Sequence, residues 1–99
     1  MTASCTVILE GSFRNGGKVS SEFEEYSRRS NANGEAHGGV VIKNYLISEN
    51  LGQGEKPDFI LIVEYPSHDS AQKAFTSDEY SRIITMRNKV FKEVKILLV

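Results

Sequence analysis

Residues 59–91, FILIVEYPSHDSAQKAFTSDEYSRIITMRNKVF, decide the fold of this 99-residue chain, because an apolar strand leads here directly into helical sequence. Residues 59–65 alternate in the two-residue period of a strand, and Pro66 ends it because proline donates no hydrogen bond to a sheet. Ser67 is expected to cap a short helix that runs to about Phe75.

A second helix follows in the same stretch. Thr76 and Glu79 have the spacing of a capping box, so the helix is predicted to restart there and to run to about Lys89 or Val90. Its apolar stripe contains Tyr80, Ile83, Ile84, Val90 and Phe91, and Arg87 stands where the helical period calls for a hydrophobic residue.

The remaining chain supplies three strands and one helix. Ser21 and Glu24 form the pattern of a capping box for the first helix, and Asn33-Gly34 has the composition of a helix end. Gly38-Gly39 allows the backbone to bend into the next strand. The predicted elements are strands at 3–10, 40–48 and 94–99 and a helix at about 19–31, with a turn at 11–17 and an exposed loop at 49–58.

The order β-α-β-β-α-β predicts an α+β, ferredoxin-like fold in which one antiparallel sheet carries both helices on one face. We expect a single domain over residues 1–99, since chains of this length usually hold one core. All four strands are apolar, so the other face of the sheet needs a cover. A second copy of the chain is the simplest one, which predicts a homodimer through the sheet face.

Composition excludes several classes of function. Twelve Lys and Arg are interspersed with 13 Asp and Glu, so no basic surface for nucleic acid is expected. No apolar run approaches the ~20 residues of a membrane span, and the N-terminus lacks the pattern of a signal peptide. Cys5 is the single cysteine and is expected to behave as a small buried hydrophobic residue. We therefore expect a cytoplasmic protein that does not contact membranes.

Five features together resemble domain of unknown function family 1330, which belongs to the dimeric α+β barrel superfamily. They are Gly38-Gly39, the glycine-rich loop before Pro57, the strand end Glu64-Tyr65-Pro66-Ser67, the segment Ser77-Asp78-Glu79-Tyr80, and Arg87. The resemblance covers about residues 38–91. It implies the ferredoxin-like fold and the dimer, but no particular chemistry, because a fold does not define a function.

Glu64 and Arg87 are the two charges that interrupt apolar patterns. They are expected either to line a pocket, with Arg87 binding a ligand carboxylate or carbonyl, or to form a buried ion pair between strand and helix. His37 lies at a strand entrance and is a second candidate proton acceptor beside Glu64, although most loop histidines are simply exposed. His37 and His68 lack the companions of a metal site, so neither a metal nor another cofactor is expected.

Three functions are consistent with these sequence patterns. In the first, the space between sheet and helices binds a small molecule that is mostly apolar or carries a carboxylate. In the second, a cofactor-free oxygenase or isomerase uses His37 or Glu64 as the base and Arg87 to stabilise an oxyanion. In the third, the dimer has a structural or stress-related role without a ligand. The predicted ligand-binding residues are Phe23, Tyr26, Tyr45, Tyr80 and Arg87.

Overall fold

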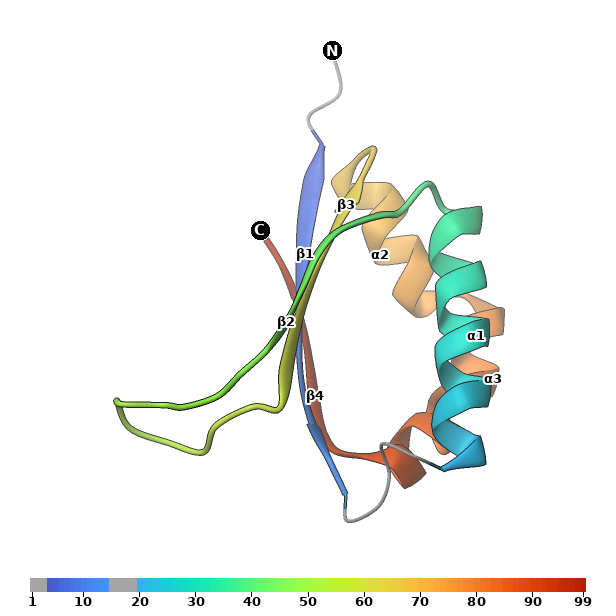
Figure 1. Ribbon diagram of the computed structural model, residues 1–99. Helices are drawn as coiled ribbons and strands as arrows, with labels where there is room; N and C mark the ends of the chain where they lie inside the picture. The colour runs from blue at the N-terminus through green and yellow to red at the C-terminus, as the bar shows by residue number, and fades with distance from the viewer. Residues whose placement is uncertain (1–3, 15–19) are drawn as a thin grey trace.

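The computed structural model describes residues 4–14 and 20–99, which form a four-stranded antiparallel sheet with its helices packed on one face (Figure 1). The order of the strands in the sheet is β2-β3-β1-β4. The elements are β1 (Cys5–Phe13), α1 (Ser21–Ala36), β2 (Val40–Leu46), β3 (Phe59–Tyr65), α2 (His68–Thr76), α3 (Asp78–Val90) and β4 (Phe91–Leu98).

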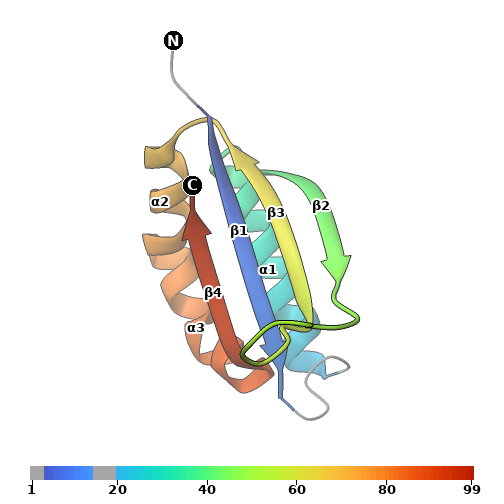
Figure 2. The same ribbon diagram turned by 90° about the vertical axis from the view of Figure 1, so that its left-hand side faces the viewer.

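This strand order confirms the predicted ferredoxin-like fold. The chain crosses over the helical face twice, once through α1 and once through α2 and α3, and β2 and β3 form a hairpin at one edge of the sheet (Figure 2). Strand β1 occupies the centre, where it pairs with both β3 and β4. Strand β2 is an edge strand, and every one of its residues is exposed.

The two faces of the sheet differ in burial because side chains alternate along each strand. On the helical face, Cys5, Val7 and Leu9 of β1 are buried. Residues on the opposite face, which we call the distal face, are only partly buried, as Thr6 and Ile8 show. The loop between β2 and β3 projects from the distal face (Figure 1).

The core on the helical face contains two groups of buried side chains. One group joins β1 and β3 to the two buried alanines of α2, and the other joins α1 to α3 and to the start of β4. The first comprises Cys5, Val7, Leu9, Val63, Tyr65, Ala71 and Ala74, and the second comprises Tyr26, Tyr80, Ile83, Val90 and Phe91.

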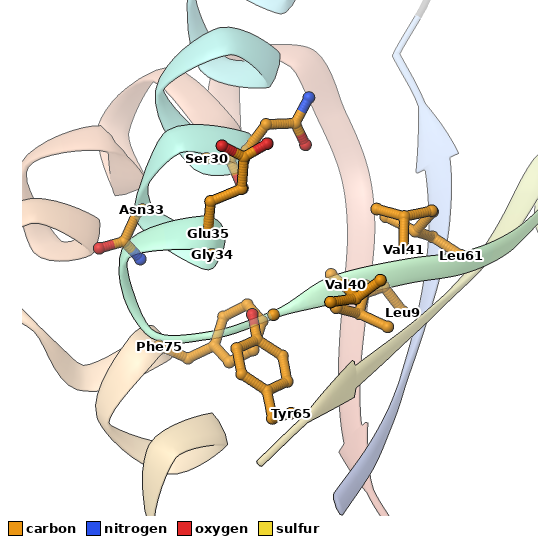
Figure 3. A pocket seen from close by; sticks show the side chains of 13 residues that line it. Leu9, Ser30, Asn33, Gly34, Glu35, Val40, Val41, Leu61, Tyr65 and Phe75 are labelled. Atoms are coloured by element: carbon orange, nitrogen blue, oxygen red, sulfur yellow. The ribbon is translucent and has the colours of Figure 1, made fainter.

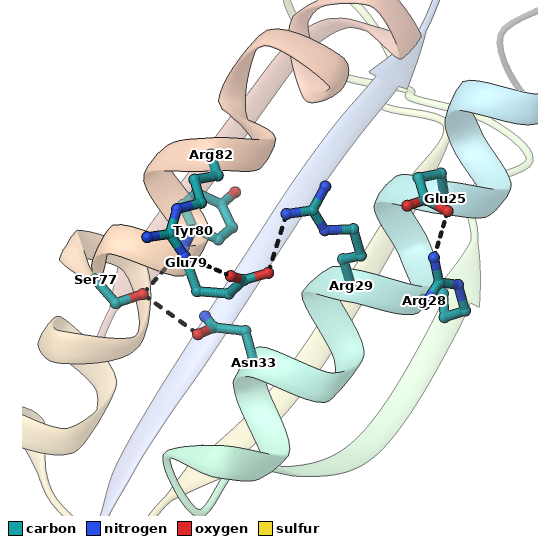
Figure 4. Close-up of polar contacts among 8 residues, drawn as sticks. All are labelled: Glu25, Arg28, Arg29, Asn33, Ser77, Glu79, Tyr80 and Arg82. Atoms are coloured by element: carbon teal, nitrogen blue, oxygen red, sulfur yellow. Dashed lines mark hydrogen bonds and ion pairs between the residues drawn. The ribbon is translucent and has the colours of Figure 1, made fainter.

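Polar contacts fix α1 against the other two helices (Figure 4). Arg29 pairs with Glu79 at 3.1 Å, and hydrogen bonds from Arg29 and Arg82 lower the pKa of the Glu79 carboxyl. The buried Asn33 side chain donates to the Ala74 carbonyl at 2.7 Å and accepts from Ser77 Oγ at 3.3 Å. Since a buried amide without partners is costly, these bonds define how the helices meet.

The prediction that the first strand ends at residue 10 is wrong, because β1 continues to Phe13. Gly11 lies opposite Phe59 in the sheet, and a Cβ added at Gly11 would lie 2.5 Å from Phe59 Cζ. The glycine therefore makes room for a ring and does not begin a turn. The predicted turn at Asn15-Gly16-Gly17 lies outside the described residues.

The first helix is also longer than predicted, since α1 runs through Asn33-Gly34 to Ala36. Its end comes where Gly38 adopts a φ of +84° and the Gly39 amide donates to the Gly34 carbonyl at 2.8 Å. This left-handed residue confirms the expected role of the glycine pair as a bend into the strand. The predicted helix start at Val19 lies outside the described residues.

The two predicted capping boxes are each displaced by one residue. Ser20 caps α1 by accepting from the Phe23 amide at 3.1 Å, and Ser77 caps α3 by accepting from the Tyr80 amide at 3.1 Å. In both places two adjacent residues carry a hydroxyl, so either could occupy the N-cap position. The residue at which the helix begins determines which of the two is the cap. Ser67 does cap α2, as predicted.

The remaining boundaries differ slightly from the predicted ones. Strand β2 ends at Leu46 and β4 already begins at Phe91, whereas β3 has the predicted bounds. None of the helices in the described residues is long and apolar enough to cross a membrane.

Candidate functional site

A cleft lies between α1 and the sheet, on the side where β2 forms the edge. It consists of two adjoining cavities of about 440 and 400 Å³, each within the range of typical ligand sites. Figure 3 shows the larger one, the Tyr65 cavity, with Tyr65 and Phe75 at one end and Val40 and Val41 on the wall formed by β2. Both cavities are lined by Leu9, Ser30, Asn31, Val41 and Leu61.

The smaller cavity, which we call the aromatic cavity, has walls made largely of rings. Phe13 lies at the centre of the cluster, stacked on Phe91 with ring centroids 5.2 Å apart and edge-on to Phe23 at 5.5 Å. Leu46 and Asn44 of β2 stand at its exposed side. The five rings that line it are Phe13, Phe23, Tyr26, Phe59 and Phe91.

The Tyr65 hydroxyl is a buried polar group of this cleft that has no hydrogen-bond partner among the described residues. Only 3% of Tyr65 is exposed, and no described residue forms a hydrogen bond with its hydroxyl. Every fully buried side-chain nitrogen or oxygen of the described residues has a partner, so this oxygen must be open to the cavity that Tyr65 lines. A buried hydroxyl normally finds a partner, and here a bound molecule can supply it.

The cleft is electrically neutral at pH 7 apart from Glu35 at its rim. Burial raises the pKa of the Tyr65 hydroxyl, and the neighbouring Tyr80 raises it further. Burial likewise raises the pKa of Tyr26 far above the ordinary tyrosine value, again with a contribution from Tyr80. Both phenols therefore stay protonated, and no lysine, arginine or histidine is among the lining residues.

Behind the aromatic cavity, a short chain of polar side chains connects α1 with α3. The hydroxyls of Tyr26 and Tyr80 share a hydrogen bond of 2.9 Å, and Arg87 donates to the Tyr80 hydroxyl at 3.3 Å. The Arg87 guanidinium also lies 5.8 Å from the centre of the Tyr80 ring. Neither Tyr80 nor Arg87 lines the cleft, so the predicted role of Arg87 in holding a ligand carboxylate has no geometric support there.

The expected pairing of Glu64 with Arg87 does not occur, because the sheet separates them. Glu64 points to the distal face, opposite Thr6 in the pairing of β3 with β1, and accepts from Thr6 Oγ1 at 2.8 Å. Hydrogen bonds from Ser4 and Thr6 lower the pKa of Glu64. Arg87 lies on α3, on the other side of the sheet, so the two charges form neither an ion pair nor the walls of one pocket.

His37 and Tyr45 also lie away from the cleft. The His37 ring is bonded through Nδ1 to the Asn33 carbonyl at 2.9 Å, and it borders a shallow hollow on the outer side of α1. Tyr45 faces the distal side opposite Ile60, with Lys43 Nζ 5.8 Å from its ring centre. Of the five predicted ligand-binding residues, only Phe23 and Tyr26 line the cleft.

Sequence reasoning missed several of the lining residues. Phe13 follows Gly11, where the sequence predicts a turn, so the residue pattern does not place Phe13 on the strand. Phe59 and Tyr65 do appear on one face of the predicted strand 59–65, and that alternation is the signal that identifies them. No pattern in the sequence shows that α1 leaves space above β2 and β3.

The fold and this cleft define an α+β protein of the ferredoxin-like class. Residues 18–99 match the family described as Domain of unknown function (DUF1330), which is more than half of the chain, and the protein belongs to that family. The resemblance derived from the residue pattern is thereby confirmed. No curated protein matches the chain.

Several solved structures share the fold. A protein of unknown function from Rhodopseudomonas palustris, RPA0582, is 16% identical with a TM-score of 0.80, covering 100% of this chain and 82% of its own. The cofactor-independent oxygenase SnoaB from Streptomyces nogalater is 16% identical with a TM-score of 0.66, covering 97% and 90%. A dimeric protein of unknown function and ferredoxin-like fold from Bacteroides fragilis is 14% identical with a TM-score of 0.62, covering 97% and 94%. At these identities the likeness is one of fold alone.

Proposed function

We propose that this protein is a homodimeric binding protein that holds a small, mostly apolar, neutral molecule in the cleft between α1 and the sheet. The observation that carries the proposal is the Tyr65 hydroxyl, which has no partner in the described part of the chain and is open to a cavity of about 440 Å³. If the core were filled, there would be no cavity at this place, and the Tyr65 hydroxyl would be hydrogen-bonded to a protein group. The apolar walls, and the absence of a cationic side chain among the described lining residues, favour a neutral ligand over a carboxylate.

The proposed partner is a second copy of the chain, packed on the distal face. Ile62, Ile8 and Leu97 form an apolar row across β3, β1 and β4 on this face, and Leu97 is 43% exposed. Such a row on an open sheet is a typical interface between copies of a small domain. The similar fold of the dimeric protein from Bacteroides fragilis supports the same arrangement. A cytoplasmic location stays a prediction from the sequence.

The alternative of a cofactor-free oxygenase or isomerase draws support only from the fold shared with SnoaB. Its two candidate bases are poorly placed for work in the cleft. Glu64 lies on the distal face, and His37 borders the hollow outside α1. A general base has to come within hydrogen-bond reach of the proton that it removes. We therefore place binding ahead of catalysis.

A blocking variant tests whether the cleft binds ligands. Val41 lines both cavities and is 57% exposed, whereas its neighbour Ile42 is 56% exposed and lines neither cavity. The larger side chain of Val41→Trp should fill space where the two cavities adjoin. Ile42→Trp is the matched control. The probes are 2-naphthol and its saturated counterpart, decahydro-2-naphthol, measured by titration calorimetry.

We expect at least one probe to bind the native protein and Val41→Trp to weaken that binding about ten-fold or more, a loss of about 1.4 kcal/mol. Ile42→Trp should change the affinity less than two-fold, and both variants should keep the native oligomeric state. Binding of both probes that is unaffected by Val41→Trp would refute the proposed site. If neither probe binds the native protein, the proposed class of ligand is refuted.

A further inference from the structure

From the lining of the aromatic cavity and of the adjoining Tyr65 cavity, we infer that the ligand is a flat, neutral aromatic molecule. It carries an oxygen that hydrogen-bonds to Tyr65. This inference rests on the proposed function and specifies the chemical class of the ligand. The ring system would lie among the phenyl groups of the aromatic cavity, and its oxygen would reach into the Tyr65 cavity. The two cavities share a wall, so one molecule can occupy both.

The first argument is the identity of the wall residues in the aromatic cavity. Five of them carry rings, contributed by β1, α1, β3 and the start of β4. Phe59 and Phe91 have centroids 5.8 Å apart, and Tyr26 meets Phe91 edge-on at 5.5 Å. Rings at such distances and mixed tilts offer both faces and edges, which favours another ring over an alkyl group of equal size.

The rings are also held in place, so the cavity has a defined shape. The Tyr26 hydroxyl is hydrogen-bonded to Tyr80, which holds the Tyr26 ring in place as a wall of the cavity. Gly11 leaves the space that the Phe59 ring occupies. A site whose rings are already oriented loses little conformational entropy when a ligand binds.

The second argument is the chemistry at the other end of the cleft. Tyr65 lines its cavity together with Phe75, Val40 and the backbone of Gly34 and Gly39 (Figure 3). Its protonated hydroxyl has a hydrogen to donate and no described protein acceptor. An uncharged oxygen on the ligand, such as a carbonyl or a phenol, would satisfy it without bringing a charge into the cleft.

Two comparisons of affinity test the inference in the full-length protein. All affinities are measured by titration calorimetry, because decahydro-2-naphthol has no aromatic chromophore and Val41→Trp adds an indole to a chain without tryptophan. The first compares 2-naphthol with decahydro-2-naphthol, which has the same carbon skeleton and hydroxyl but no aromatic ring. The second compares 2-naphthol with naphthalene, which lacks the oxygen.

We expect 2-naphthol to bind about five-fold or more tightly than its saturated counterpart, because favourable ring contacts add to simple burial. Phe23→Leu should reduce this preference to less than two-fold. Tyr45→Leu is the matched control, since Tyr45 is an aromatic residue that lines neither cavity. It should leave the preference unchanged.

The oxygen is tested with Tyr65→Phe, which removes the hydroxyl and keeps the ring. The variant should weaken 2-naphthol about five-fold and leave naphthalene unchanged within two-fold. If 2-naphthol and decahydro-2-naphthol bind with equal affinity and Val41→Trp weakens both, the inference of an aromatic ligand is overturned. The proposal that the cleft binds a ligand would still stand. Equal loss of naphthalene and 2-naphthol in Tyr65→Phe would overturn the role of the hydroxyl.

Discussion

The hydroxyl oxygens of Tyr26 and Tyr80 lie 2.9 Å apart in the buried contact between α1 and α3. Replacing either tyrosine by phenylalanine leaves the other hydroxyl without this partner, at an expected cost of about 1–2 kcal/mol of unfolding free energy. The double replacement should cost less than the sum of the single ones, because no unpaired hydroxyl remains. Urea denaturation of the four proteins measures this coupling, and strict additivity would contradict it.

Alkaline pH should destabilise the protein through Tyr26. Burial raises the pKa of Tyr26 in the folded protein above its ordinary value of 10.0, while in the unfolded chain the group titrates near that value. The folded state therefore holds a proton that the unfolded chain releases above about pH 10. Its stabilising contribution is complete below that pH and declines above it, by up to about 1.4 kcal/mol per pH unit.

Denaturation curves between pH 8 and 11.5, with tyrosinate absorbance followed in parallel, measure this dependence. Tyr26→Phe should show a shallower decline at high pH than the native protein. Ionisation of Tyr26 near pH 10 in the still folded protein would contradict the expected pKa shift.

The space beside Gly11 should be essential for the aromatic cavity. An added Cβ would lie 2.5 Å from Phe59 Cζ, so Gly11→Ala must displace the ring or the strand, at about 1–3 kcal/mol of stability. The displaced ring should also reduce the affinity for 2-naphthol. Gly52→Ala, in the exposed loop between β2 and β3, is the control and should be nearly neutral. Unchanged thermal stability of Gly11→Ala would contradict this expectation, because it would mean that the Phe59 ring can adopt another conformation without a loss of stability.

Arg87 should contribute to stability mainly through Tyr80, because its other hydrogen bond, to Asn88 Oδ1 at 3.3 Å, is exposed. Arg87→Ala removes a hydrogen bond of 3.3 Å and a contact of the guanidinium with the ring, which together predict a loss of about 1 kcal/mol. Because Glu64 lies across the sheet, the effect of Glu64→Gln should add to that of Arg87→Ala within about 0.5 kcal/mol. A larger coupling in the double-mutant cycle would indicate that the two charges do interact.

A charge in the middle of the distal face should separate the proposed dimer. Ile8 lies between Ile62 and Leu97 in the apolar row, so Ile8→Lys places an ammonium group where the second copy would pack. We expect light scattering coupled to size-exclusion chromatography to report a dimer for the native protein and a monomer for the variant. Ala32→Lys, on the exposed surface of α1, should remain dimeric. A monomeric native protein would refute the interface.

Much of the fold follows from local patterns. The period-two alternation of residues 59–65 and the proline behind them predict β3 with its observed bounds. Hydroxyl residues ahead of helical sequence predict α2 and α3, with the cap of α3 displaced by one position. Two of the boundary errors arise where a glycine has two possible roles. The local sequence predicts the end of an element at both Gly11 and Gly34, whereas these residues lie inside β1 and α1.

The sequence by itself determined the order of the elements, the ferredoxin-like class and the family, because these depend on residue periodicity and on short motifs. It also made Phe23 and Tyr26 candidates for the lining of a pocket, together with Tyr45, Tyr80 and Arg87, and it marked Glu64 and Arg87 as unusual charges. Only the tertiary structure decided which of these residues meet. Alternation along β3 places Glu64 on the face away from α3, and the distance that α1 keeps from β2 opens the cleft beside Tyr65. Both depend on the packing of segments far apart in the chain, which no local pattern records.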